Sequence, residues 1–291
     1  MPVAVACAVL NVSTSGYYAW KRRPASHRQR RDMVLLAHIK AEFAESNETY
    51  GSPRMHAELK ERQEESGSPI GRIGRHRVAR LMSANGMKAR QKTRFKKTTD
   101  SDHGGPVAAN VLAQDFTADA PDQKWGVDIT YVWTAEGWLY LAIVLDMFSR
   151  RIVGWSISDR MKRGLAIQAL QRAITLRQPA AGLIHHSDRG SQYCSDDYRK
   201  LVAAHAFTAS MSGRGNCYDN AMVETVFKTI KAELIWQTSY QSRWDATQAI
   251  GRYIEGFYNV RRRHSSLGYV SPAAFEAKFR AAAANEQSTL H

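Results

Sequence analysis

The chain has 291 residues, 44% of them hydrophobic, and a formal net charge of +14. The length suits two domains, and the composition supports packed cores and excludes a disordered protein. The charge indicates a polyanionic partner such as nucleic acid, although a basic surface can also serve solubility alone. Residues 1–100 hold 20 Lys and Arg against 9 Asp and Glu, so the expected contact surface is the front third.

Cysteine usage and apolar runs limit the class further. The three cysteines are scattered without a CxxC pair, which supports neither a zinc finger nor a disulfide framework and suits a reducing compartment. The apolar start has no basic leading segment and makes a poor signal peptide. The longest central apolar run, Leu139–Leu145, is too short to cross a bilayer. We expect a cytoplasmic protein with no membrane partner.

Three short helices predict a small all-α domain at residues 28–92. Helical spacing covers 28–46, Ser52 and Pro53 suit the start of a second helix, and RHRVARLMSANG (75–86) predicts a third. The residues expected to face inward are Met33, Leu36, Ala37 and Phe43 in the first helix, Met55 and Leu59 in the second, and Val78, Leu81 and Met82 in the third. The arginine-rich third helix makes the domain resemble a helix-turn-helix module, the alternative being a basic bundle without specificity. The expected DNA contacts there are Arg75, Arg77 and Arg80.

Three further segments flank the folded parts. Residues 1–27 are expected to form a helical segment that looks truncated at its start. Residues 93–120 are basic and then rich in glycine, and we interpret them as a linker that follows DNA. Residues 281–291 are expected to be a tail.

From residue 121 the pattern predicts an α/β domain that extends to 280. Three strands rich in β-branched and aromatic residues, linked as hairpins, are followed by helix, strand, helix and strand. A mobile loop is expected at 212–219, before helices at 220–236 and 242–258. This order is ribonuclease-H-like and predicts a mixed five-stranded sheet flanked by helices. The expected core aromatics include Trp125, Trp133, Trp138 and Trp155.

Three carboxylates fall on the central elements of this domain. Asp128 lies inside an apolar strand, where an unpartnered carboxylate is costly, Asp188 ends the fourth strand, and Glu224 begins a helix. Each has an ordinary alternative role. Asp128 could form a buried ion pair, Asp188 could only shape a tight turn, and Glu224 could complement the helix dipole or pair with Lys228 four residues later. Together they form an oxygen ligand set of the kind that hard cations prefer.

The sequence around these carboxylates resembles a known family. WGVDIT, HSDRGSQY and NAMVETVFKTIKAEL resemble the three motifs of the transposase and retroviral-integrase superfamily. Thirty-five residues separate Asp188 from Glu224, which is the family's spacing. YGSPRMHAEL, RHRVARLMSANGMKAR and FYNVRRRHSSLGYVSPAAFE extend the resemblance to the OrfB proteins of bacterial insertion sequences of family three, over residues 28–280.

The resemblance implies an enzyme that cleaves and joins DNA strands at the ends of a mobile element. It implies that Asp128, Asp188 and Glu224 hold two Mg²⁺ ions, with Mn²⁺ able to substitute, for a two-metal reaction. It also implies double-stranded DNA as partner, both element ends and target, a homo-oligomer assembled on that DNA, association with the bacterial nucleoid, and fusion with or help from an OrfA segment.

Further residues are assigned by the same reasoning. Lys231 lies two helical turns after Glu224, where the family keeps a basic residue for DNA. The remaining expected DNA contacts are Lys228, Arg262, Arg263 and His264, the alternatives being an ion pair for Lys228 and a solvated face for the others. His185 and His186 are not expected to bind metal. Two other functions stay open: a DNA-binding regulator or partial subunit that is inactive without OrfA, and a nuclease for RNA–DNA hybrids.

Overall fold

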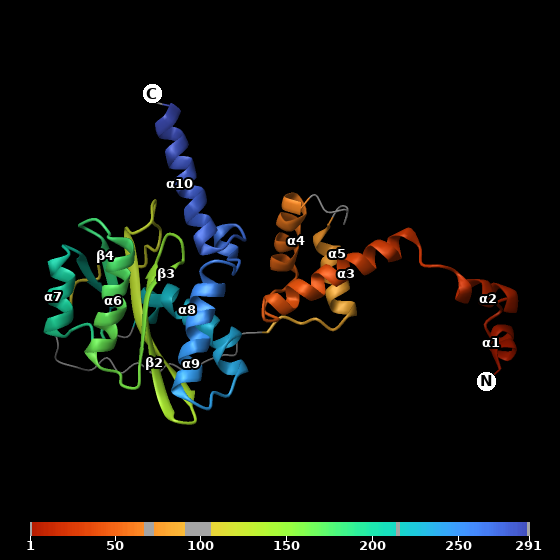
Figure 1. The fold of residues 1–291 in the computed structure, drawn as a ribbon, viewed down its shortest axis with the longest axis horizontal. Coiled ribbons are helices and arrows are strands. Elements are labelled where there is room, and N and C mark those ends of the chain that lie inside the picture. Colours follow the sequence, from red (N-terminus) through yellow and green to blue (C-terminus); the bar gives the residue numbers. More distant parts are fainter. Residues whose placement is uncertain (1, 67–72, 91–105, 214–215, 290–291) are drawn as a thin grey trace. The chain divides into compact units, whose positions relative to one another are not determined.

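The computed structural model describes residues 2–66, 73–90, 106–213 and 216–289 (Figure 1). They fall into two compact units, Met1–Ala89 and Arg90–His291. No helix among the described residues is long and apolar enough to cross a membrane.

The first unit is entirely helical. Its helices are α1 (Val3–Val9), α2 (Thr14–Arg22), α3 (His27–Glu45), α4 (Ser52–Ser66) and α5 (Arg75–Ala84). Ser26 and Gln29 form a capping box that starts α3, because each side chain accepts a hydrogen bond from the other residue's backbone N–H. The core is made by Leu35, Ile39, Met55, Leu59, Val78, Leu81 and Met82.

The face that α3 buries differs from the face that its sequence suggested. Met33 was expected to belong to the apolar stripe, but its side chain is 65% exposed. Leu35 and Ile39 are buried instead, because α4 and α5 pack on that side of the helix. The expected inward residues of α4 and α5 are buried as predicted.

The second unit is built on the expected mixed five-stranded sheet. Its strands are β1 (Lys124–Thr134), β2 (Gly137–Asp146), β3 (Ile152–Ser158), β4 (Ile184–Ser187) and β5 (Thr208–Met211). Their order is β3-β2-β1-β4-β5. β1, β2 and β3 pair antiparallel, whereas β4 is parallel to both β1 and β5. The predicted fold class is therefore confirmed.

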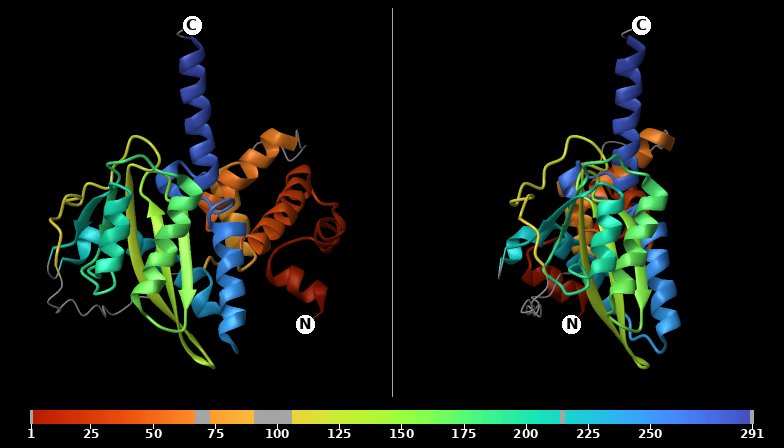
Figure 2. Two further views of the ribbon diagram at one scale, coloured as in Figure 1. Left: turned by 60° about the vertical axis from the view of Figure 1, so that its left-hand side comes forward. Right: turned by 90° about the vertical axis from the view of Figure 1, so that its left-hand side faces the viewer.

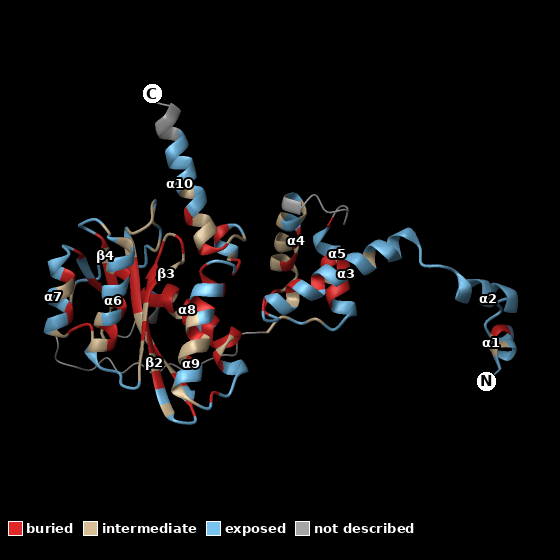
Figure 3. Ribbon diagram, in the orientation of Figure 1, coloured by how far each residue is buried: buried red, intermediate tan, exposed pale blue. Residues whose placement is uncertain are grey.

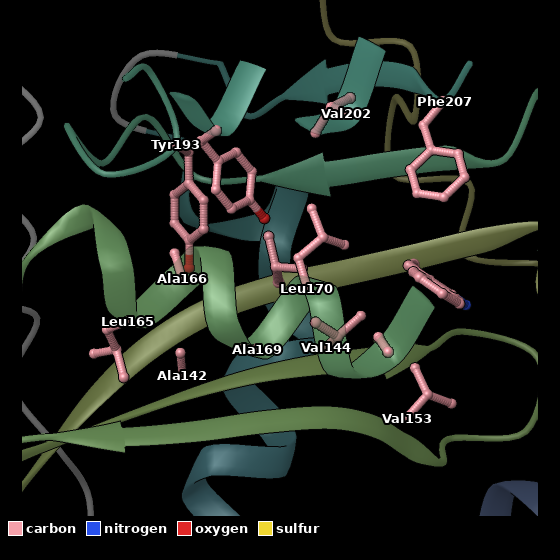
Figure 4. Packing of buried hydrophobic residues seen from close by; sticks show 14 of the residues in the cluster. Ala142, Val144, Val153, Leu165, Ala166, Ala169, Leu170, Tyr193, Val202 and Phe207 are labelled. Carbon is pink, nitrogen blue, oxygen red and sulfur yellow. The ribbon is translucent and has the colours of Figure 1, made fainter. Parts of the chain in front are cut away.

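Helices cover both faces of the sheet (Figure 2). They are α6 (Arg163–Arg177), α7 (Asp196–Ala204), α8 (Ala221–Glu233) and α9 (Arg243–Gly251). The last helix, α10 (Pro272–Thr289), covers neither face and projects away from the sheet (Figure 1). On one face α6 approaches so closely that a Cβ on Gly154 would stand 2.4 Å from the carbonyl oxygen of Ala169. Figure 4 shows Ala166, Ala169 and Leu170 of this helix packed in the core that the sheet shares with α6 and α7.

The opposite face carries α8 and α9. A Cβ on Gly126 of β1 would lie 2.6 Å from Val223 of α8, and one on Gly251 of α9 would lie 3.2 Å from the Trp155 ring. The predicted helix at 242–258 is α only as far as Gly251, after which Arg252–Tyr258 continue as a π-helix, η3. The burial of the strands between these layers is visible in Figure 3.

Part of the expected linker belongs to this unit. Leu112 is 1% exposed, and the backbone N–H groups of Val111 and Leu112 both donate to Ser210 Oγ at 3.0 Å. Residues 106–120 therefore lie against the sheet and do not form a spacer, while 93–105 lie outside the described residues. The expected tail at 281–291 begins inside α10.

Two of the four expected core tryptophans are on the surface. Trp125 is fully buried, but Trp133 is 59% exposed and Trp138 is 44% exposed. Both lie at the far end of the β1–β2 hairpin, beyond the part of the sheet that α6 and α7 cover. The alternating aromatic pattern predicted the strands correctly and the burial of their ends incorrectly.

Candidate active site

Asp128 lies on β1, just beyond the point where the pairing of β1 with β4 ends. β4 pairs with Lys124, Trp125 and Gly126, short of Asp128. Because side chains alternate along a strand, Asp128 shares the face of Gly126, against which α8 packs. Its Oδ1 accepts a hydrogen bond from the Ile129 N–H at 2.7 Å.

Asp188 follows directly after β4, at the carboxyl end of the strand next to β1. Its Oδ1 accepts the Gly190 N–H at 2.9 Å, so the residue does shape the tight turn that its sequence also suggested. The next residue fixes the loop: Arg189 Nε donates to the Ser212 carbonyl at 2.8 Å, beyond the end of β5.

Glu224 lies in the first turn of α8, and Asp219 secures the start of that helix. The buried Asp219 carboxylate accepts hydrogen bonds from the Asn110 and Gln114 amides at 3.0 Å, the Gly213 N–H at 2.7 Å and the Asn216 amide at 2.9 Å. The described residues of the loop expected to be mobile are thus held by one carboxylate. Residues 214–215 lie outside the described part of the chain.

The three carboxylates interact electrostatically. Burial raises the pKa of Asp128 well above its ordinary value, and the charges of Asp188 and, more weakly, Glu224 raise it further. The Lys231 ammonium opposes this rise. The charges of Asp188 and Glu224 therefore both act on Asp128, although the three side chains come from separate elements.

The donor set fits a hard divalent cation, since its ligands are carboxylate oxygens whose mutual repulsion a cation relieves. Among the described residues, however, no three His, Cys, Asp or Glu side chains converge closely enough to enclose an ion. The Glu224 carboxylate points to Lys228, with Oε2 3.5 Å from Nζ, so it has to turn from this pair to complete such a site.

A cleft of about 520 Å³ opens beside the carboxylates. Asp128 and Asp188 line it, together with the loop after β4 and aromatic residues of the hairpin. Its remaining lining consists of Ile129, Tyr131, Trp138, Tyr140, Met161, Gly190, Ser191, Gln192 and Tyr193.

Several residues expected to contact DNA are held inside the protein. Arg262 is 2% exposed and forms an ion pair with Glu233, which contradicts its predicted phosphate contact. Arg263 is 8% exposed and donates to the Tyr269 carbonyl at 2.8 Å. The His264 N–H donates to the Val270 carbonyl, and its ring packs on Tyr258. Within the described chain this cluster is structural.

Lys231 is also buried, at 7% exposure, with Nζ 4.6 Å from the centre of the Tyr131 ring. Burial lowers the pKa of Lys231, and the nearby Asp128 charge raises it. Its predicted role in phosphate binding does not fit this position. Lys228 on the same helix is exposed and keeps its pair with Glu224, as the ordinary alternative proposed.

In the first unit, two of the three arginines expected to contact DNA form ion pairs within the protein. Arg77 Nε and Arg80 Nη2 each lie 2.6 Å from the Asp32 carboxylate of α3, and these contacts lower the pKa of Asp32. Arg75 is exposed at the start of α5.

The two histidines of the fourth strand are buried and hydrogen-bonded. His185 Nε2 lies 2.9 Å from the Tyr198 hydroxyl, and His186 bridges the Ser210 and Ser212 hydroxyls at 2.9 and 3.2 Å. Burial lowers the pKa of each histidine to about 4.

Three residues of the site escaped the sequence analysis. Asp219 was placed in a mobile loop, although an Asp that closes a run of small polar residues is a familiar turn signal. Trp138 was assigned to the core. Tyr193 lines the cleft, and its buried hydroxyl has no hydrogen-bond partner among the described residues.

Comparisons with known proteins match nearly the whole chain. Family models described as HTH-like domain and as integrase core domain match residues 29–95 and 118–217, and a second integrase core model matches 205–272. A 31 kDa protein of insertion element IS600 from Shigella sonnei is 45% identical, covering 96% of this chain and all of that protein. Transposase InsF of insertion sequence IS3A from Escherichia coli is 42% identical over 94% of this chain and 93% of its own length.

Among solved structures, the HTLV-2 integrase catalytic core domain in complex with magnesium is 15% identical, with a TM-score of 0.44. It matches 55% of this chain and 99% of its own.

Proposed function

The chain belongs to the IS3 family of insertion-sequence transposases, DNA-acting polynucleotidyl transferases, and we propose that it cuts and joins DNA strands through a two-metal Asp-Asp-Glu site. In this proposal Asp128, Asp188 and Glu224 bind the metal ions, Mg²⁺ or Mn²⁺. The substrate is double-stranded DNA at the ends of the element and at the target.

One observation carries the proposal: the carboxylates of Asp188, after β4, and Glu224, at the start of α8, both act electrostatically on Asp128 of β1, and the two aspartates line one cleft. Such crowding destabilises the ionised protein alone and favours bound divalent cations. When bound, the cations supply the Lewis acidity that activates a water or 3′-hydroxyl and stabilises the leaving oxygen.

The protein residues supply position and neutralise charge. Asp128 stands on β1 and Asp188 directly after β4, and these positions keep the phosphodiester in line with its attacker. Glu224 completes the ligand set by leaving Lys228, whose freed ammonium is then exposed beside the DNA backbone. No serine, tyrosine or cysteine nucleophile is required.

The first unit binds DNA through its helix-turn-helix-like fold, with Arg75 as an expected phosphate contact. We further propose that copies of the chain assemble on the element ends, with or without an OrfA segment. Action on chromosomal DNA places this assembly at the bacterial nucleoid.

The proposal is tested with a plasmid that carries this coding sequence and its flanking DNA. Wild type, Glu224→Gln, Asp128→Asn and Asp188→Asn are compared in Mg²⁺, Mn²⁺ or EDTA, with Asp197→Asn as a control because that carboxylate is exposed and pairs with Arg163 outside the cleft. We expect metal-dependent nicks and joints at the element boundaries with wild type and the control alone, and nearly unchanged DNA binding by every variant.

Each other outcome has a definite meaning. A variant at Asp128, Asp188 or Glu224 that cleaves normally removes that residue from the site. A wild-type chain that neither nicks nor joins, alone or fused to an OrfA segment, but still binds DNA overturns the proposal in favour of a regulator. Preferential cutting of an RNA–DNA hybrid would identify a nuclease.

A further inference from the structure

Aromatic side chains form one wall of the carboxylate cleft. Tyr131 of β1 pairs in register with Tyr140 of β2, and Trp138 stands two residues before Tyr140 on the same face. All three line the cleft that also contains Asp128 and Asp188. The Tyr131 and Trp138 rings meet edge to face, with centroids 5.0 Å apart and planes at 87°.

This wall is exposed, yet its rings are held in place. Trp138 is 44% exposed, and the Trp133 ring packs against it with the ring centroids 4.8 Å apart. From the side of α8, the buried Lys231 ammonium lies over the Tyr131 ring at 4.6 Å. The hairpin therefore presents a large, ordered aromatic surface to solvent, and this exposed surface adds no buried area to the core.

The position of the wall determines what it can bind. A phosphodiester that reacts at Asp128 and Asp188 brings its own nucleosides into the same cleft. Aromatic rings bind bases by stacking without regard to sequence, but inside a duplex both faces of a base are covered by its neighbours. A base can stack on Trp138 only after it has left the helix.

We propose that Trp138 and Tyr131 bind an unpaired nucleobase next to the phosphodiester held at the carboxylates. This inference rests on the proposed function, since it places the reacting strand in this cleft. Stacking stabilises an opened DNA end and so fixes the position of the scissile bond. The wall is a strand-positioning element and takes no direct part in bond cleavage.

The test measures binding and requires no cleavage. Full-length protein in Ca²⁺ is titrated with two probes, a blunt DNA duplex and the same duplex with a short unpaired 3′ overhang. Trp138→Ala and Trp138→Phe are compared with wild type and with Trp244→Ala, a control whose ring is 68% exposed on α9 and does not line the cleft.

We expect Trp138→Ala to weaken binding of the overhang duplex by on the order of 5- to 150-fold, the range for one stacked base. Binding of the blunt duplex should stay within about twofold, which also serves as the control for folding. Trp138→Phe should lose less, and Trp244→Ala should lose nothing. An overhang that contains 5-iododeoxyuridine should cross-link on irradiation to Trp138 or Tyr131.

The inference is overturned if Trp138→Ala weakens both probes equally or neither of them, or if the cross-link maps outside the hairpin. These outcomes are independent of the metal-dependent cleavage that tests Glu224. A failure of the proposed function is therefore distinguishable from a failure of the aromatic wall.

Discussion

Arg262 and Glu233 form a two-point ion pair at the end of α8. Arg262 Nη2 lies 2.6 Å from Oε1 and Nε lies 2.7 Å from Oε2, with both residues nearly inaccessible to solvent. The Tyr253 hydroxyl donates to the same Oε2 at 2.6 Å. The pair joins the last turn of the helix that carries Glu224 to the π-helix and to the turn that follows it.

Arg262→Ala should therefore destabilise the protein without weakening a DNA contact. Removing one partner leaves a buried charge uncompensated, at a cost of about 3–5 kcal/mol. The double variant Arg262→Met/Glu233→Leu should recover most of this, because it removes both charges together. Urea unfolding measures the change. An Arg262→Ala protein of normal stability whose DNA affinity loses salt dependence would return Arg262 to the DNA surface.

Gly126→Ala should impair catalysis more than its size suggests. The new methyl group meets Val223 Cγ2 at 2.6 Å and forces α8, and with it Glu224, away from β1. Overpacking costs about 1–3 kcal/mol, and a displacement of ~1 Å can cost on the order of 100-fold in rate. Gly164→Ala in α6 is the control, since nothing lies within 4 Å of its added methyl. Equal cleavage rates for the two variants would separate Gly126 from the site geometry.

The contribution of His185 to stability should fall as the solution is acidified from about pH 6.5 to about pH 4. Burial lowers the pKa of His185 to about 4. In this pH range His185 is therefore protonated in the unfolded chain and largely neutral in the folded one. The stabilisation from a neutral His185 is complete above the unfolded pKa, and about 3 kcal/mol of it is lost as the pH falls to 4. His185→Gln should flatten this part of the profile in urea unfolding. An unchanged slope would mean that His185 titrates normally.

Asp32→Asn should strengthen DNA binding by the first unit while weakening the fold. The substitution releases Arg77 and Arg80, whose guanidinium groups the Asp32 carboxylate now holds. The dependence of affinity on salt concentration should steepen, because more phosphates become neutralised. Arg75→Ala should reduce that slope by about 1 in the wild-type background, whereas Arg77→Ala should change it less. Equal effects of the two arginines would place both on the DNA.

The elements and the carboxylates were predictable because their signals are local. β1 is recognisable from its run of β-branched and aromatic residues, and Asp128 stands out as the acid inside it. The strand order then places Asp188 beside it. Each element is recognisable within a short window of sequence, and only the strand order links Asp128 to Asp188.

The burial and the partners of the basic residues were not predictable from local sequence. Arg262 resembles a surface arginine in sequence, because its partner Glu233 lies twenty-nine residues earlier. Lys231 shares the helical face of Glu224, but whether that face meets solvent or the Tyr131 ring depends on tertiary packing. Trp133 and Trp138 continue the pattern of a buried strand after the layers that bury it have ended.

The π-helix that follows α9 limits which insertions and deletions this part of the sequence can accept. It places Asn259 at the start of β3, where its amide donates to the Ile152 carbonyl and accepts the Ile152 N–H, both at 3.0 Å. The wide winding of Arg252–Tyr258 takes up one residue more than an α-helix would. A residue inserted into the α-helical part before it, Arg243–Gly251, would rotate everything after it by about 100°. Asn259, Arg262 and the start of α10 would then lose their partners together. Relatives that keep this architecture are therefore expected to tolerate substitutions along α9 but not an added residue there.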